Sequence, residues 1–238
     1  MKTKDYRNGL RDGIPVALGY FAVSFAFGME AATNGLSIIQ AVLISLTNVT
    51  SAGQFSALGI IAAGGTYIEI ALTQLVINLR YCLMSFSLAQ KLDRSAANWH
   101  RYLMAYSVTD EIFALDASLN TPLTPKYHYG ITSVAVPGWV LGTFVGAISG
   151  TLLPSFVISA LGVAIYGMFL AIIIPPARQN RAILFVVLSA MRLSFLFSVL
   201  PLLKKVSSGF VIIIVTVVIA AIAAWLKPIN DENNKGES

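Results

Sequence analysis

The chain has 238 residues, of which 56% are apolar and only 11% are charged, and its formal net charge is +5. Soluble domains have about 25% charged residues, so this sequence has too few charges to cover a soluble surface. We therefore predict an all-α polytopic membrane protein, in which the excess of Lys and Arg flanks the membrane spans and does not bind nucleic acid.

Apolar segments follow one another along the chain and are separated by short polar loops. We expect about six to eight hydrophobic segments, because a helix needs roughly 20 apolar residues to cross a bilayer. They lie at 13–32, 36–64, 66–90, 99–119, 130–152, 156–175, 182–203 and 209–226. The polar tails 1–12 and 227–238 are short, so we read 13–226 as a single membrane domain with no room for a soluble catalytic domain.

Two of these segments contain small or polar residues near their centres, which predicts broken or re-entrant helices. The centre of 36–64 reads "LTNVTSAGQF", and the centre of 156–175 reads "GVAIYGMF". A helix interrupted at membrane depth is tolerated where it lines a cavity. Interrupted segments at corresponding positions of two halves indicate the binding site of a transporter.

The two halves also share an arginine in the contexts "NLRYCLMSFS" and "AMRLSFLFSV". We consider inverted repeats at 13–90 and 130–203, joined by a linking helix at 99–119. With the N-terminus inside, the bias of Lys and Arg toward the cytoplasm is largest when both broken segments enter and leave on one side. The simpler alternative, in which every segment crosses the membrane, remains open.

Charged residues inside the apolar segments are candidate functional residues, because they are costly there unless they are paired or face a cavity. Arg80 lies in the middle of 66–90, and Asp110 and Glu111 lie in the middle of 99–119. Arg80 is either held by one of these carboxylates or available to the carboxylate of a ligand. Neighbouring helical residues point about 100° apart, so one acid could pair with Arg80 while the other carries a coupling proton. Arg192 has no acid in its own segment, and its role stays open.

Three polar or small residues near the first break complete the candidate substrate site: Gly53, Gln54 and Asn78. The amide of Gln54 could orient a polar head group, and Asn78 could cap the break or touch a ligand. Glu30 and Glu69 lie near segment ends, where we expect them to reach the membrane interface.

Helix breaks or packing contacts are the roles expected for Pro15, Gly19 and Gly167. His100 and His128 fall in predicted loops without a second ligand at metal spacing, so we expect no metal. No other cofactor is indicated by the sequence.

Several catalytic motifs are absent. The sequence has no phosphate-binding loop of the G-x-x-x-x-G-K-[ST] type, no G-x-S-x-G elbow, no H-E-x-x-H and no C-x-x-C. We therefore expect no enzyme activity. Broken helices, buried charges and a repeat favour a secondary transporter, and the alternatives are a non-transporting scaffold or regulatory subunit and a passive channel.

Four short motifs carry a resemblance to a known family. They are "GIPVALGYFAVSFAFGMEA" (Gly13–Ala31), "SAGQFSAL" (Ser51–Leu58), "NLRYCLMSFSLA" (Asn78–Ala89) and "TDEIFAL" (Thr109–Leu115). In order and spacing they resemble the AzlC/BrnF/YgaZ family of branched-chain amino-acid exporters, of which this chain would be the large subunit.

The resemblance implies export of leucine, isoleucine, valine or their analogues across the bacterial cytoplasmic membrane. It also implies a small hydrophobic partner chain of the AzlD type and the use of the proton gradient. A zwitterionic substrate needs a cation for its carboxylate, which Arg80 could supply. Asp110 or Glu111 could accept its ammonium group or carry the coupling proton.

Overall fold

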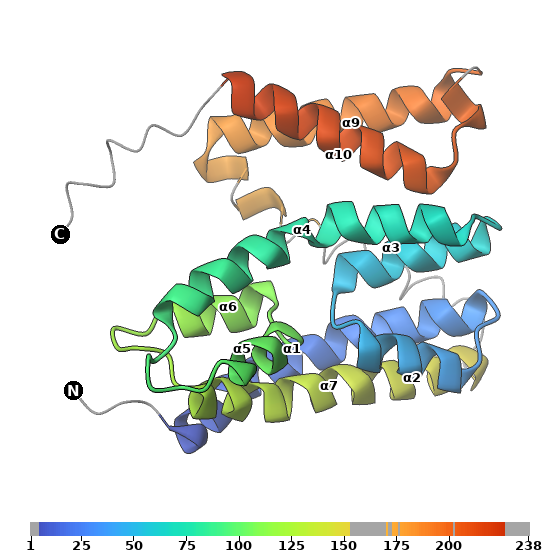
Figure 1. Cartoon of the computed structure of the whole chain (residues 1–238). Helices are drawn as coiled ribbons and strands as arrows, with labels where there is room; N and C mark the ends of the chain where they lie inside the picture. The colour runs from blue at the N-terminus through green and yellow to red at the C-terminus, as the bar shows by residue number, and fades with distance from the viewer. Residues whose placement is uncertain (1–4, 153–169, 171–172, 176, 202, 227–238) are drawn as a thin grey trace. The chain divides into compact units, whose positions relative to one another are not determined.

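The computed structural model describes residues 5–152, 170, 173–175, 177–201 and 203–226. All named elements in this part of the chain are helices, as Figure 1 shows. The chain divides into two compact units, one of residues 1–58 with 77–165 and the other of residues 59–76 with 166–238.

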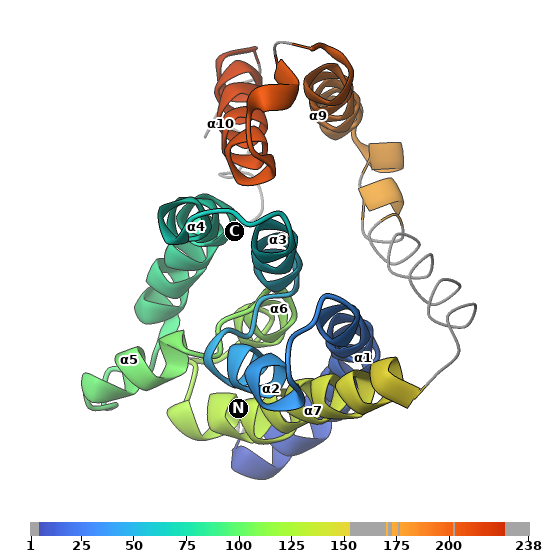
Figure 2. The same cartoon turned by 90° about the vertical axis from the view of Figure 1, so that its right-hand side faces the viewer.

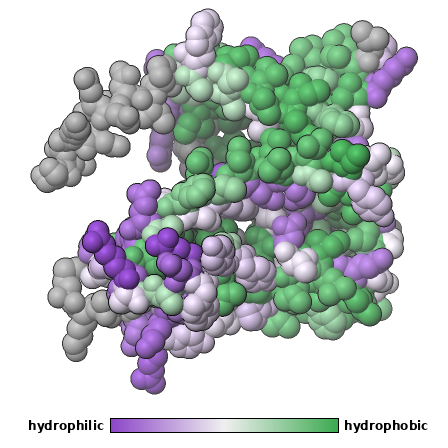
Figure 3. All heavy atoms as spheres, in the orientation of Figure 1, coloured by the Kyte–Doolittle hydropathy of each residue, from purple (hydrophilic) through white to green (hydrophobic). Residues whose placement is uncertain are grey.

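Five of the described helices are long and apolar enough to cross a membrane. They are α1 (Tyr6–Thr33), α4 (Tyr67–Lys91), α7 (Pro125–Leu152), α9 (Arg181–Val199) and α10 (Ser208–Leu226). Hydrophobic side chains cover the visible face of α9 and α10 in Figure 3. The predicted all-α polytopic membrane fold is confirmed, and the repeat boundaries remain a prediction.

In the first unit, α1 lies along α7, as both views of the ribbon show (Figures 1 and 2). Glycines line the contact between the two helices. A Cβ on Gly146 would overlap the carbonyl oxygen of Phe25, and a Cβ on Gly28 would overlap that of Thr143. Membrane helices associate through close van der Waals packing, which small residues permit. The glycines therefore let the two backbones touch.

α1 continues through Pro15 as one helix, so the helix does not end there. A Cβ on Gly19 would meet open space. The roles of Pro15 and Gly19 in bending or packing the helix remain predictions. Gly167 lies outside the described residues.

The predicted break in the segment 36–64 is confirmed. α2 (Ile38–Thr47) ends at its C-cap Asn48, and α3 (Ser51–Ala62) begins three residues later. The predicted second break, in 156–175, lies largely outside the described residues.

The single linking helix predicted at 99–119 is wrong, because this segment forms α5 (Trp99–Ala105) and α6 (Asp110–Ala117). Thr109 has an extended backbone, with φ −125° and ψ 172°, and its hydroxyl accepts a hydrogen bond from the N–H of Ile112. A threonine N-cap followed by two acids in the first turn is a helix-start signal. The apolar character of the whole segment obscured it.

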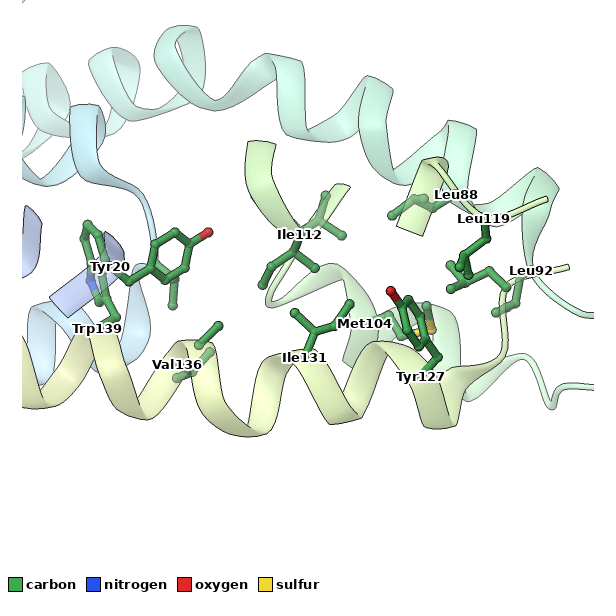
Figure 4. Packing of buried hydrophobic residues seen from close by; sticks show 14 residues of the cluster. Tyr20, Leu88, Leu92, Met104, Ile112, Leu119, Tyr127, Ile131, Val136 and Trp139 are labelled. Carbon is green, nitrogen blue, oxygen red and sulfur yellow. The ribbon is translucent and has the colours of Figure 1, made fainter. Parts of the chain in front are cut away.

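The main hydrophobic core of the first unit lies along α7. Its largest members form a row beside that helix in Figure 4, and they come from α1, α4, α5, α6, α7 and the adjoining loops: Tyr20, Leu88, Leu92, Met104, Ile112, Leu119, Tyr127, Ile131, Val136 and Trp139. α7 therefore serves as the support against which the short helices α5 and α6 are placed.

In the second unit, α9 and α10 lie side by side, and the first part of α4 contributes Glu69. Contrary to expectation, Glu69 is buried and accepts a 2.8 Å hydrogen bond from the N–H of Gly209 at the start of α10. The first N–H groups of a helix have no partner within the helix. Glu69 thus caps α10.

Candidate functional site

Arg80, on α4, forms an ion pair with Asp110, the first residue of α6. Its Nη1 lies 2.5 Å from Asp110 Oδ2, and the two side chains are 43% and 41% exposed. Nη2 donates to the hydroxyl of Tyr81, 3.1 Å away. Both members of the pair are therefore positioned by other groups and still accessible.

Glu111, the next residue of α6, is turned toward α1. The hydroxyl of Tyr20 donates to Glu111 Oε2 at 2.9 Å and is also hydrogen-bonded to the hydroxyl of Thr109. Both acids lie in the first turn of α6, where the positive end of the helix dipole stabilises negative charge. The two adjacent carboxylates thus have different partners on different helices.

A chain of buried contacts leads from Tyr20 to the first helix break. The ring of Tyr20 meets the ring of Trp139 edge to face, with centroids 5.3 Å apart, as Figure 4 shows. Trp139 Nε1 donates to Gln54 Oε1 at 3.0 Å, and Gln54 Nε2 donates to Ser45 Oγ at 2.8 Å. Ser45 Oγ lies 2.6 Å from the hydroxyl oxygen of Thr143.

The two breaks also touch directly and are tied to α4. Tyr106, in the break between α5 and α6, donates its hydroxyl to the carbonyl oxygen of Leu46 near the end of α2. Thr50, in the break between α2 and α3, donates to Asn78 Oδ1 at 2.9 Å. These contacts satisfy polar groups that an interrupted helix would otherwise expose.

The structure brings Arg80, Asp110 and Glu111 together in one place. Asn78 accepts a hydrogen bond from Thr50, which lies in the first break. Gln54 is fully buried and uses both ends of its amide to join α3 to α2 and α7, and Gly53 is buried beside it. Gln54 therefore joins three helices in this arrangement, and its role toward a substrate remains a prediction.

Sequence reasoning missed Tyr20, Thr109 and Trp139. The helix-start pattern around Thr109 could have been found. Nothing in the sequence near Tyr20 or Trp139 indicates their contacts, because they reach partners that are distant in the chain.

Comparison with known protein families gives a match over more than half of the chain. The model of the family described as AzlC protein matches residues 15–153, a range that contains both breaks and all the site residues above. The chain belongs to the AzlC family. No solved structure matches it.

Two curated AzlC relatives are similar over about three quarters of their length. The inner membrane protein YgaZ of Escherichia coli is 28% identical over 185 residues, covering 75% of this chain and 76% of the relative. An uncharacterized membrane protein of Archaeoglobus fulgidus is 30% identical over 176 residues, covering 73% and 77%.

This AzlC protein has a second polar cluster, which the sequence did not predict. His128 was expected in a loop. It lies instead in the first turns of α7, where it is fully buried. Its Nδ1 lies 2.6 Å from Asp116 Oδ2 and its Nε2 lies 2.8 Å from Ser107 Oγ. His100 lies on α5, with Nδ1 2.8 Å from the hydroxyl of Tyr129.

This cluster has the order of a Ser–His–Asp triad, but Ser107, His128 and Asp116 are all buried, with 1%, 0% and 0% exposure. A nucleophile must reach the reacting atom of a substrate, and Ser107 is enclosed by its own partners. Within the described residues, no group of three or more His, Cys, Asp or Glu side chains could hold a metal ion.

Proposed function

We propose that this chain is a secondary transporter subunit that exports branched-chain amino acids or their analogues. In this proposal it lies in the bacterial cytoplasmic membrane with its N-terminus inside, is coupled to the proton gradient, and works with a small hydrophobic partner of the AzlD type. Membership of the AzlC family supports a transport role. The proposed location in the cytoplasmic membrane agrees with the name of the relative YgaZ, which is described as an inner membrane protein.

The observation that carries the proposal is the accessible pair of Arg80 and Asp110 beside Glu111. Charges at membrane depth are costly, so they face a cavity or a partner and mark substrate pathways. A zwitterion carries both charges. The substrate carboxylate would replace Asp110 as the partner of Arg80. The substrate ammonium group would then pair with the carboxylate that was released from Arg80, so that no charge is left unpaired.

The side chain of such a substrate would lie against apolar surface. Each methylene in a hydrophobic pocket changes the free energy by only about 1–3 kcal/mol. The site would therefore separate leucine from a polar amino acid well and from valine only weakly, which suits a transporter of several aliphatic amino acids.

In this proposal the helices move when an amino acid binds. A cavity between α4 and α5, with Leu88, Met104 and Val108 in its lining, has a volume of about 20 Å³, which is room for about one water molecule. The two breaks, at 48–50 and 106–109, provide places where the short helices could turn while the long helices stay intact.

The decisive test is efflux of preloaded radiolabelled leucine from cells that express this chain, its small partner, or both. Efflux that needs both chains and stops with a proton uncoupler supports the proposal. Arg80→Gln should abolish this efflux, while Arg94→Gln, the same change at an exposed position outside the helices, should preserve it. Retention of leucine, valine and methionine in every combination would overturn the substrate assignment.

The same experiment separates the two alternatives. A scaffold or regulatory subunit would tolerate Arg80→Gln as long as the complex assembles. A passive channel would conduct without any dependence on the gradient, so a proton uncoupler would leave its efflux unchanged.

A further inference from the structure

We propose that Asp116 and His128 form a buried proton-binding pair and that this pair carries the proton coupled to transport. The second half of this statement rests on the proposed function, and the first half does not. The hydroxyl groups of Ser107 and Thr132 can donate or accept, so they would keep the pair hydrogen-bonded in either protonation state.

The pair is enclosed on all sides that the structure describes. Asp116 comes from the last turn of α6 and His128 from the start of α7, and neither side chain is exposed. Ser107 Oγ lies between His128 Nε2, at 2.8 Å, and Thr132 Oγ1, at 2.9 Å. The remaining carboxylate oxygen of Asp116, Oδ1, is buried and has no hydrogen-bond partner among the described residues.

Charge balance indicates that the pair holds one extra proton. An ionised Asp116 beside a neutral His128 would leave a net negative charge in an enclosed site, with one oxygen unsatisfied. Burying an uncompensated charge is strongly unfavourable, because the protein interior does not replace its hydration. A shared additional proton makes the pair neutral overall, and its loss requires water or a cation to reach Asp116.

The hydroxyl groups around the pair can serve both states without moving heavy atoms. When His128 is neutral with its proton on Nδ1, its Nε2 accepts a hydrogen bond from the hydroxyl of Ser107, and Thr132 can donate to Ser107 Oγ. When His128 is protonated, Nε2 donates to Ser107 Oγ, and Ser107 donates to Thr132 or to the carbonyl oxygen of Met104, 3.4 Å away. A hydroxyl can be a donor or an acceptor, so the network is satisfied before and after proton transfer.

A purely structural ion pair would not need this reversibility. The position of the pair is also mechanically relevant, because Ser107 lies in the break at 106–109 and Asp116 lies at the other end of α6. A movement of α6 that opens the substrate site would separate Asp116 from His128 on α7. Protonation and substrate access would then be linked through one short helix.

Other ionisable groups surround the pair and must be considered in any titration. The nearest ones on α7 are Tyr127, which donates to Asp12 Oδ2 on α1 at 2.8 Å, and Tyr129, which contacts His100 on α5. At the C-terminal end of α6, Lys91 Nζ donates to the carbonyl oxygen of Ala117. In the described part of the chain, Asp116 and His128 form their ion pair with each other.

The chain has only two histidines, which makes a direct test practical. In the full-length His100→Gln protein, labelled with ¹⁵N-histidine, every imidazole signal belongs to His128. We expect an imidazolium in the pair with Asp116, and a neutral ring in the additional Asp116→Asn variant. A single neutral tautomer from about pH 5 to pH 9 would overturn the proton-binding pair, even if Asp116→Asn fails to fold.

The coupling role is tested in proteoliposomes that contain the complete transporter. Asp116→Asn and His128→Gln should lose gradient-driven leucine efflux to a much larger extent than leucine counterflow, which moves no net proton. His100→Gln is the matched control and should respond to the gradient like the wild type. Equal losses of efflux and counterflow would overturn the coupling role. If the wild type shows no counterflow, the proposed function fails, and the imidazole spectrum still decides the protonation of the pair.

Discussion

Glu69 on α4 accepts a 2.8 Å hydrogen bond from the backbone N–H of Gly209, in the first turn of α10. A Cβ at position 209 would lie 2.5 Å from Cγ of Glu69, so any larger residue there would force the Glu69 side chain to shift. A carboxylate at a helix N-terminus both accepts from an otherwise unpaired N–H and balances the helix dipole. Two residues that are distant in sequence thus form one cap.

Removal of this cap should destabilise the protein. We expect Glu69→Ala to lower the free energy of unfolding by about 1–2 kcal/mol, because the start of α10 loses its acceptor. Thermal unfolding in detergent would measure the loss. Glu30→Ala, which removes a partly exposed acid near the end of α1, is the control, and an equal effect of both substitutions would contradict the cap.

The packing of α1 against α7 predicts different outcomes for two glycines. Gly146→Ala should destabilise the protein by about 1–3 kcal/mol, because the new methyl group overlaps the backbone of Phe25. Gly19→Ala meets open space and should be neutral or stabilise α1 by about 0.5–1 kcal/mol. The same unfolding assay compares them, and a tolerated Gly146→Ala would show that the helices are farther apart than described.

The pair of Arg80 and Asp110 should matter more for transport than for stability. Both side chains are about two-fifths exposed, and exposed pairs contribute about 0.2–1 kcal/mol. Arg80→Gln, Asp110→Asn and the double variant should therefore unfold nearly like the wild type while efflux is lost in all three. The double-mutant cycle built from the unfolding free energies of these variants gives the interaction energy of the pair. A large interaction energy, with efflux intact in the double variant, would instead identify a structural ion pair.

Tyr20→Phe tests the contact between α1 and α6. The substitution keeps the ring against Trp139 but removes the hydroxyl that donates to Glu111. Loss of a hydrogen bond to a charged group is worth about 1.5–3 kcal/mol, so we expect a decrease in efflux of about tenfold or more. Tyr6→Phe, which removes a hydroxyl bonded to Ser133, should have little effect. Similar efflux in both variants would exclude a role for Tyr20.

The difference between the two breaks shows where sequence reasoning worked. The break at 48–50 was predictable because Asn, Thr, Ser and Gly interrupt an apolar run. The break at 106–109 has the helix-start signal Thr109–Asp110–Glu111, but the apolar residues around it make 99–119 look like a continuous span. Local capping chemistry ended α5 where hydrophobicity alone predicted that it would continue.

Composition and apolar runs determined that this protein is an all-α membrane protein and that Arg80, Asp110 and Glu111 lie within apolar segments of its sequence. Each of these features can be recognised within one segment of the sequence, because the thickness of the bilayer sets the length of an apolar segment. Only the tertiary structure decided that Arg80 pairs with Asp110, that Glu111 binds Tyr20 and that His128 meets Asp116. These pairings join separate helices, so they depend on how α1, α4, α6 and α7 are placed and on the direction of each side chain at a helix end.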